Sequence, residues 1–352
     1  MRRILSRLLL AAATALVASP AGAQTIPGDV EAKFLFGTRA LPASLPAASH
    51  GFYSKGCLAG GQAIAVDGPN WQSMRLSRNR RWGHPKTIEV VERLAKDVEK
   101  DGRNGILVGD ISQPRGGPML TGHASHQIGL DADIWLRDMP ERRFTIEERE
   151  SESAISVLKD DTREVDERVW TEGHANLVWR AATYPEVQRI LVHPAIKKKL
   201  CETATGDRSW LSKVRPYYGH HYHMHVRLHC QPGSPNCRRQ AAVKNDTGCG
   251  EEIAWWMSDE PWRPKKKSGK TKIIKPKTIA TLPPMCRGVL TAAAPASEAD
   301  VTRGGTDFAL DSAVAKLWAE RARERRDGEP ELADVGLPAD GPEPRDRPVT
   351  AS

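Results

Sequence analysis

The 352-residue sequence lacks the features of several common protein classes. It has no apolar run long enough to cross a membrane, and a mean hydropathy of −0.51 predicts that it is not an integral membrane protein. No two cysteines are spaced as Cys-x2-Cys, so we expect no structural zinc site built on cysteine. Neither Ser77 nor Ser125 sits in a Gly-x-Ser-x-Gly or Ser-x-x-Lys frame, which argues against a serine hydrolase.

Cysteine is scarce, but its count is even. The six cysteines are Cys57, Cys201, Cys230, Cys237, Cys249 and Cys286. In an exported chain an even number predicts disulfides, and six cysteines allow 15 pairings that the sequence alone leaves open. Cys230 and Cys237 flank a Gln-Pro-Gly-Ser-Pro-Asn turn, a spacing that suits a small closed loop.

Residues 1–23 have the pattern of a secretion signal. A basic N-terminal region with three arginines is followed by an apolar run over 8–17. Ala21 and Ala23 fit the −3 and −1 positions of a cleavage site. We therefore expect the mature chain to begin at Gln24. No lipidation cysteine follows that site, so the mature protein is predicted to be soluble and outside the cytoplasm.

The positive charge is concentrated in two segments. The whole chain carries +8, and removal of the three signal arginines lowers this to +5. Residues 263–277 alone contribute +8 and contain no acid, so the rest of the mature chain is slightly acidic. This distribution argues against a nucleic-acid binder. The basic segment is predicted to be a solvated loop, and the alternative is a tether to an anionic polymer.

Composition divides the mature chain into two parts. Residues 24–287 are predicted to form one globular domain, with 263–277 as its basic loop. Residues 288–352 form a low-complexity tail, in which Phe308–Arg326 has the spacing of one amphipathic helix. Within the domain, periodicity predicts helices over Pro85–Lys100 and Pro194–Leu200 and strands over Ile106–Val108 and Val187–Val192.

Two further predicted strands carry polar residues on one face. In Tyr222–Leu228 the apolar residues alternate with His223, His225 and Arg227, and in Leu130–Leu136 they alternate with Asp131, Asp133 and Trp135. A glycine-containing loop that carries His126 leads into the second strand.

These strands predict a catalytic metal site. His126, Asp133 and His225 make a set of three ligands with one open position, which is typical of catalytic Zn²⁺. Water in that position would be acidified by the ion and poised to attack an amide carbonyl. His223 lies next to the set and is expected to act as a general base or to stabilise the developing oxyanion.

Several long motifs resemble the family of the penicillin-insensitive murein endopeptidases. They are MRLSRNRRWGHP from Met74, GDISQPRGGPMLTGHASHQIGLDADIWL from Gly109 and KVRPYYGHHYHMHVRLHC from Lys213. The pattern His126-x6-Asp133 with His223-x-His225 is also that of the wider group containing lysostaphin, D-Ala-D-Ala peptidases and the hedgehog signalling domain. The resemblance covers roughly residues 51–286.

The resemblance implies a role for each site residue. It places the zinc ligands at His126, Asp133 and His225, and two further active-site histidines at His220 and His223. A second metal position in the family would involve His123 and, through a downstream Asp-x-x-His pair, His174. This sequence departs from that pair, because Thr171 stands where the family has aspartate.

The resemblance also implies the fold, the disulfides and the substrate. It predicts an α+β domain whose small antiparallel sheet carries the zinc site, with flanking helices and long loops. The implied disulfides are Cys57–Cys286, Cys201–Cys249 and Cys230–Cys237. The implied substrate is peptidoglycan, cleaved in the periplasm at the D-alanyl–meso-diaminopimelyl cross-bridge.

Two alternative functions use the same ligands. A D,D-carboxypeptidase or D-Ala-D-Ala dipeptidase generally has a glutamate base before the His-x-His pair, where this sequence has His220 and His221. A zinc-dependent murein-binding module would keep the ligands without turnover, and the presence of both His220 and His223 argues against it. The endopeptidase is therefore favoured.

Overall fold

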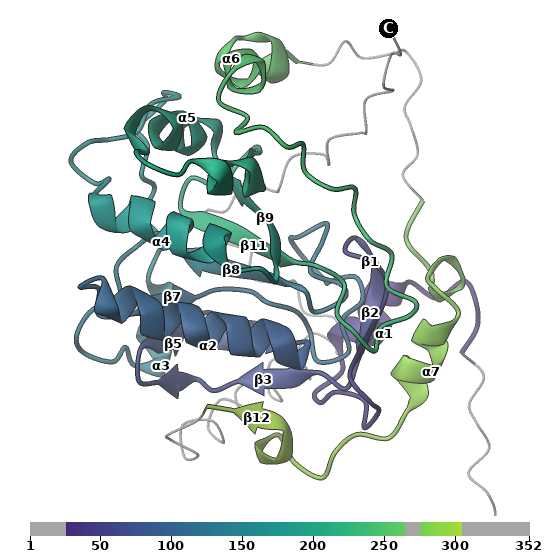
Figure 1. The fold of residues 1–352 in the computed structure, drawn as a ribbon. Helices are drawn as coiled ribbons and strands as arrows, with labels where there is room; N and C mark the ends of the chain where they lie inside the picture. Colours follow the sequence, from purple (N-terminus) through teal and green to yellow (C-terminus); the bar gives the residue numbers. More distant parts are fainter. Residues whose placement is uncertain (1–25, 265–274, 305–352) are drawn as a thin grey trace, which may run out of the picture.

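The computed structural model describes residues 26–264 and 275–304, which form an α+β domain (Figure 1). The helices are α1 Ala32–Gly37, α2 Pro85–Lys100, α3 Ile146–Ser151, α4 Glu172–Thr183, α5 Pro194–Thr203, α6 Glu251–Met257 and α7 Met285–Thr291. The strands are β1 Ala48–Phe52, β2 Lys55–Ala59, β3 Gln62–Ile64, β4 Asp67–Gly68, β5 Trp71–Ser73, β6 Trp82–Gly83, β7 Ile106–Val108, β8 Asp131–Trp135, β9 Val187–Val192, β10 Val214–Pro216, β11 His223–Leu228 and β12 Thr302–Arg303. Within the described residues, the strands and helices predicted from periodicity are present, with shifts of a few residues at some ends.

The main sheet is larger than predicted and mixed in direction. It has seven strands in the order β10-β9-β11-β8-β7-β5-β4 and includes parallel pairs, so the expectation of a small antiparallel sheet is wrong. The central pair β8–β11 is antiparallel, as expected, but β9–β10 and β5–β7 are parallel. Parallel neighbours need a crossover connection, and α5 and α2 lie in the segments that supply it.

The sheet separates the apolar core from the polar face. Met224, Val226 and Ala132 belong to a core cluster that also contains the inner faces of α2, α4 and α5. These three helices cover one face of the sheet (Figure 1). The alternate residues of β8 and β11, including Asp133 and His225, therefore lie on the opposite face.

α2 shows how local sequence sets its own boundaries. Its first residue is Pro85, and the side chain of His84 caps it, because His84 Nδ1 accepts a hydrogen bond from the Lys86 amide at 3.2 Å. Nε2 of His84 is buried and has no hydrogen-bond partner within the described ranges. Burial, aided by the Lys86 ammonium, lowers the pKa of His84 to about 4.

This cap is expected to make stability depend on pH. The unfolded chain binds more protons than the folded chain between about pH 4 and the ordinary histidine pKa of 6.5, so the free energy of unfolding falls as the pH drops through this window. The slope contributed is at most about 1.4 kcal/mol per pH unit. His84→Asn keeps a capping oxygen that does not titrate, so its urea-unfolding free energies at pH 7 and pH 4.5 should differ by less than those of the wild type. An unchanged difference would show that His84 is not the titrating group.

Three disulfides close the domain, and all three implied pairings are confirmed. Cys57–Cys286 joins β2 to α7, Cys201–Cys249 joins α5 to the start of α6, and Cys230–Cys237 closes the short loop.

The packed chain continues beyond the boundary predicted at residue 287. Leu290 of α7 is buried and β12 pairs with β3.

Several predicted features lie outside the described residues. They are the signal 1–23, most of the basic segment 263–277, and the tail helix Phe308–Arg326. In the part of the chain that is described, no helix is long and apolar enough to cross a membrane.

Candidate metal centre

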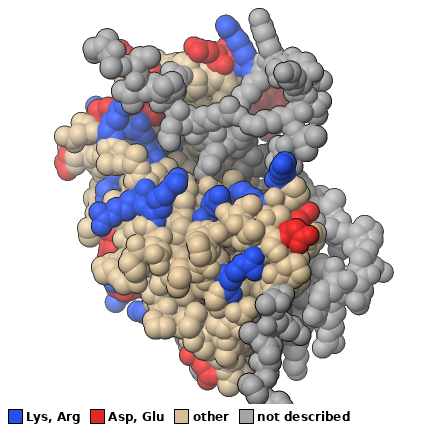
Figure 2. Space-filling model, turned by 90° about the vertical axis from the view of Figure 1, so that its right-hand side faces the viewer, with Lys and Arg blue, Asp and Glu red and all other residues tan. Residues whose placement is uncertain are grey.

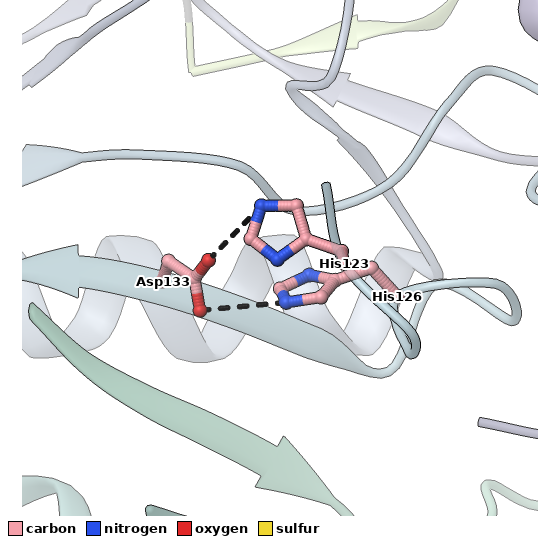
Figure 3. Close-up of side chains that lie close together, drawn as sticks. All are labelled: His123, His126 and Asp133. Atoms are coloured by element: carbon pink, nitrogen blue, oxygen red, sulfur yellow. Dashed lines mark ion pairs between the residues drawn. The ribbon is translucent and has the colours of Figure 1, made fainter. Parts of the chain in front are cut away.

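Two adjacent strands and two loops supply the polar cluster. In the β8–β11 pair, His225 is opposite Asp133 and His223 is opposite Trp135. The loop before β8 adds His123 and His126, and Figure 3 shows both rings directed toward Asp133. The side chains of His126, Asp133 and His225 are each at most 5% exposed.

The loop backbone is strained at these histidines. His123, His126 and His220 have φ angles of 34°, 62° and 54°, in the left-handed region. This conformation costs a residue with a side chain roughly 1–2 kcal/mol. At His126 the cost is offset by two contacts: its backbone N–H donates to Asp131 Oδ2 at 2.9 Å, and its ring Nδ1 donates to the Ile111 carbonyl at 2.7 Å. These two contacts hold the strained backbone in place and fix the direction in which the imidazole points.

Three potential ligand atoms meet at one point. His126 Nε2 lies 3.4 Å from Asp133 Oδ1, and His225 Nδ1 lies 3.1 Å from the same oxygen. The two ring nitrogens are themselves 3.1 Å apart. The three distances form a nearly equilateral triangle.

The hydrogen bonds on the far side of each ring define which nitrogens carry lone pairs. His126 Nδ1 donates to a backbone carbonyl, so its Nε2 carries a lone pair. His225 Nε2 donates to Asp131 Oδ1 at 3.0 Å, so its Nδ1 also carries one. Asp133 Oδ1 is buried and accepts no hydrogen bond from any described residue. When both rings are neutral, three electron-rich atoms face one another, an arrangement that needs a shared proton or a bound cation between them.

The triangle fits the dimensions of a tetrahedral Zn²⁺ ion. Bonds of about 2.0–2.2 Å at tetrahedral angles place ligand atoms roughly 3.3–3.6 Å apart, close to the separations found here. Two imidazoles and one carboxylate are a ligand set of the catalytic type. Burial alone would raise the pKa of Asp133, but positive charge on His126 and His223 lowers it well below its usual range, and a cation held in the triangle would act in the same direction.

Two more histidines border the triangle. His223 Nε2 lies 3.6 Å from Asp133 Oδ1, and the rings of His220 and His223 are 4.8 Å apart. His220 Nδ1 donates to the Tyr218 carbonyl at 2.7 Å, and the His220 ring lies 5.8 Å from the His225 ring, centroid to centroid. The structure thus brings His220 and His223 beside the predicted ligands without placing them in the triangle.

His123 lies at the open side of the cluster. Its Nε2 is 2.9 Å from Asp110 Oδ2 and 3.7 Å from Asp133 Oδ2, and its side chain is 15% exposed. Together with His126 and Asp133 it forms a second grouping whose ligand atoms lie within 4.8 Å of one another. Burial alone would raise the pKa of Asp110, but Arg80 and Arg78 hold it well below its usual range.

His174 is not brought to the cluster. It lies in the first turn of α4, where its Nδ1 accepts a hydrogen bond from the Thr171 amide at 3.0 Å. Its ring stacks on Trp170, with centroids 5.3 Å apart. The contacts of His174 therefore belong to the start of this helix, and its assignment as a metal ligand stays a prediction.

Sequence reasoning missed Asp131, which connects the ligands. One oxygen of Asp131 accepts hydrogen bonds from His225 Nε2 and Arg227 Nε, and the other accepts one from the His126 amide. Burial alone would raise the pKa of Asp131, but Arg227 and His225 lower it. The available signal was its alternation with Asp133, which places both carboxylates on one face of β8.

The chain is similar to known peptidases over most of this domain. The family model described as penicillin-insensitive murein endopeptidase matches residues 49–291. A protein of that name from Haemophilus influenzae is 45% identical over 240 residues, which are 68% of this chain and 81% of that protein. The namesakes from Klebsiella pneumoniae and Escherichia coli K12 are 41% and 39% identical, over 69% and 72% of this chain and 86% and 89% of their own lengths.

These matches and the site define the class of protein as a peptidase. Within that class, the chain belongs to the penicillin-insensitive murein endopeptidase family.

Proposed function

We propose that this protein is a Zn²⁺-dependent endopeptidase of the periplasm, which hydrolyses D-alanyl–meso-diaminopimelyl cross-bridges in peptidoglycan. The observation that carries the proposal is the triangle of lone pairs on His126, Asp133 and His225. Membership of a family whose relatives are named murein endopeptidases supports the substrate.

The residues of the site have two roles, as metal ligands and as general acid–base groups. His126, Asp133 and His225 would hold the ion. Asp131 orients the ring of His225 and anchors the backbone of His126, whose ring is oriented by the Ile111 carbonyl. An ion held there would act as a Lewis acid that acidifies water and polarises the scissile carbonyl. The mechanism would then use no serine nucleophile, so a β-lactam would have no active-site serine to acylate. The ring of His220 and Nε2 of His223 border this position, where the two histidines could accept the proton of the attacking water and donate one to the leaving amine.

The proposed location rests on two features. Residues 1–23 have the pattern of a secretion signal. The described part of the chain has three disulfides and no free cysteine, as is usual for proteins of an oxidising compartment.

The surface charge suits an anionic polymer as substrate. Lys and Arg side chains spread across the middle of the face in Figure 2, with only isolated acidic groups.

Digestion of purified cross-linked muropeptide dimers tests the proposal. We expect the mature protein to convert dimers into intact monomers, identified by mass spectrometry, and to lose this activity in the presence of a chelator. Release of free D-alanine from monomers, with dimers left intact, would instead indicate a D,D-carboxypeptidase. Unchanged dimers with Zn²⁺ retained would indicate a binding module.

A further inference from the structure

We propose that a groove between α4 and α5 binds the glycan strand of peptidoglycan through neutral N-acetylhexosamine rings. The groove has a volume of about 550 Å³, which lies in the range of small-ligand sites. This inference rests on the proposed function, because it names a second part of the same polymer as the ligand.

Three tryptophans from different segments line the groove. Trp170 precedes α4, Trp179 lies near the end of α4, and Trp210 follows α5. Trp170 is nearly buried and stacks on His174, whereas Trp179 is 37% exposed and has the Arg180 guanidinium over its ring, 4.9 Å from the centroid. Sugar rings have flat faces of C–H groups, and indole rings offer large, rigid apolar surfaces of matching size.

Polar side chains that are free to make hydrogen bonds line the groove together with the tryptophans. The amide of Asn176, the carboxylate of Glu172 and the hydroxyl of Thr205 line the groove, and none makes a hydrogen bond to another described residue. A hexosamine ring has hydroxyl and acetamido groups at its edge. The indoles could therefore pack on the apolar face of the sugar while these polar side chains form hydrogen bonds with its edge.

The charges of the groove favour a neutral ligand over the peptide stems. The one cation in its lining, Lys199, is paired with Glu167 at 2.7 Å. Both oxygens of Asp207 accept hydrogen bonds from Ser209, and Glu172 adds a further negative charge. Stem peptides carry free carboxylates, which this acidic lining would repel, whereas the amidated sugar chain of intact peptidoglycan has no charge.

The groove and the metal centre occupy different sides of the molecule. α4 and α5 pack on the face of the sheet that carries the apolar residues of β8 and β11 (Figure 1). Asp133 and His225 alternate with those residues along the strands and so lie on the other face. A glycan in the groove would therefore anchor the enzyme to the polymer without contacting the scissile bond. Loss of the groove is expected to weaken action on whole sacculi and to leave cleavage of small dimers unchanged.

Calorimetric titration with β-1,4-linked N-acetylglucosamine hexamer, a neutral probe, tests the proposal. Trp179→Ala should weaken binding of the hexamer about five- to tenfold, since loss of one stacked ring costs roughly 1 kcal/mol or more. Asn176→Ala should also weaken it. Phe34→Ala removes an aromatic ring that is 52% exposed on α1, outside the groove, and should have no effect.

The same variants separate this proposal from the proposed function. Wild-type and Trp179→Ala proteins should cleave muropeptide dimers at equal rates, while the variant binds and digests sacculi less well. Equal hexamer binding by wild type and Trp179→Ala, or binding of an isolated stem peptide in its place, would overturn the glycan assignment. If the wild type bound the hexamer but cleaved no dimers, the proposed function would fail while the groove assignment stood.

Discussion

His225→Ala is expected to lose both Zn²⁺ and cleavage of muropeptide dimers, whereas His223→Ala is expected to keep Zn²⁺ and lose cleavage. The difference follows from geometry. His225 Nδ1 is a corner of the ligand triangle, while His223 Nε2 stands 3.6 Å from Asp133 Oδ1 beside it. Removal of a group that transfers protons typically lowers the rate about 10²- to 10⁴-fold.

Metal content by mass spectrometry and kcat on dimers check both variants together. His229→Ala is the matched control, because this histidine directly follows β11 and is exposed. It should retain both the metal and the rate. Normal cleavage by His223→Ala would show that its proposed catalytic role is wrong, and Zn²⁺ bound normally by His225→Ala would do the same for the ligand set.

Asp131→Asn is expected to weaken Zn²⁺ binding about 10- to 100-fold, although Asp131 is not a ligand. One oxygen of Asp131 accepts a hydrogen bond from the ring of His225, and the other accepts one from the strained backbone of His126. The asparagine has similar volume but lacks the charge that keeps His225 Nε2 protonated and Nδ1 directed at the ion. We therefore describe Asp131 as a positioning residue.

The affinity for Zn²⁺, measured by competition with a chromogenic chelator, checks this prediction. Because Asp131→Asn leaves Arg227 buried without its anionic partner, the variant is also expected to be less stable. The double variant Asp131→Asn/Arg227→Gln removes that unpaired charge and should recover stability while its Zn²⁺ affinity stays low. Near-normal kcat at saturating Zn²⁺ would be consistent with positioning. A loss of stability with unchanged Zn²⁺ affinity would contradict it.

The elements that depend on local signals were predictable from the sequence. Pro85 and the apolar periodicity after it define α2, and the predicted range matches the observed one. The alternation in Tyr222–Leu228 correctly assigned Met224 and Val226 to the core. Such patterns reflect which residues face the apolar side of an element, and this information is present in the sequence itself.

The features that depend on distant partners were not predictable in the same way. No local signal shows that β9 pairs in parallel with β10, because a crossover connection sets this pairing. The role of Asp131 depends on its contacts with His225 and Arg227, 94 and 96 residues away. The α4–α5 groove likewise forms only when Trp170 and Trp210, far apart in sequence, meet in space.

Titration of Zn²⁺ into the metal-stripped mature protein, with dimer cleavage followed at each addition, tests the central claim most directly. The lone-pair triangle of His126, Asp133 and His225 predicts no cleavage without metal and recovery in proportion to the ion bound in that site. His225→Ala should show no recovery at the same Zn²⁺ concentrations. Full activity of the stripped protein, or equal recovery by His225→Ala, would contradict the account.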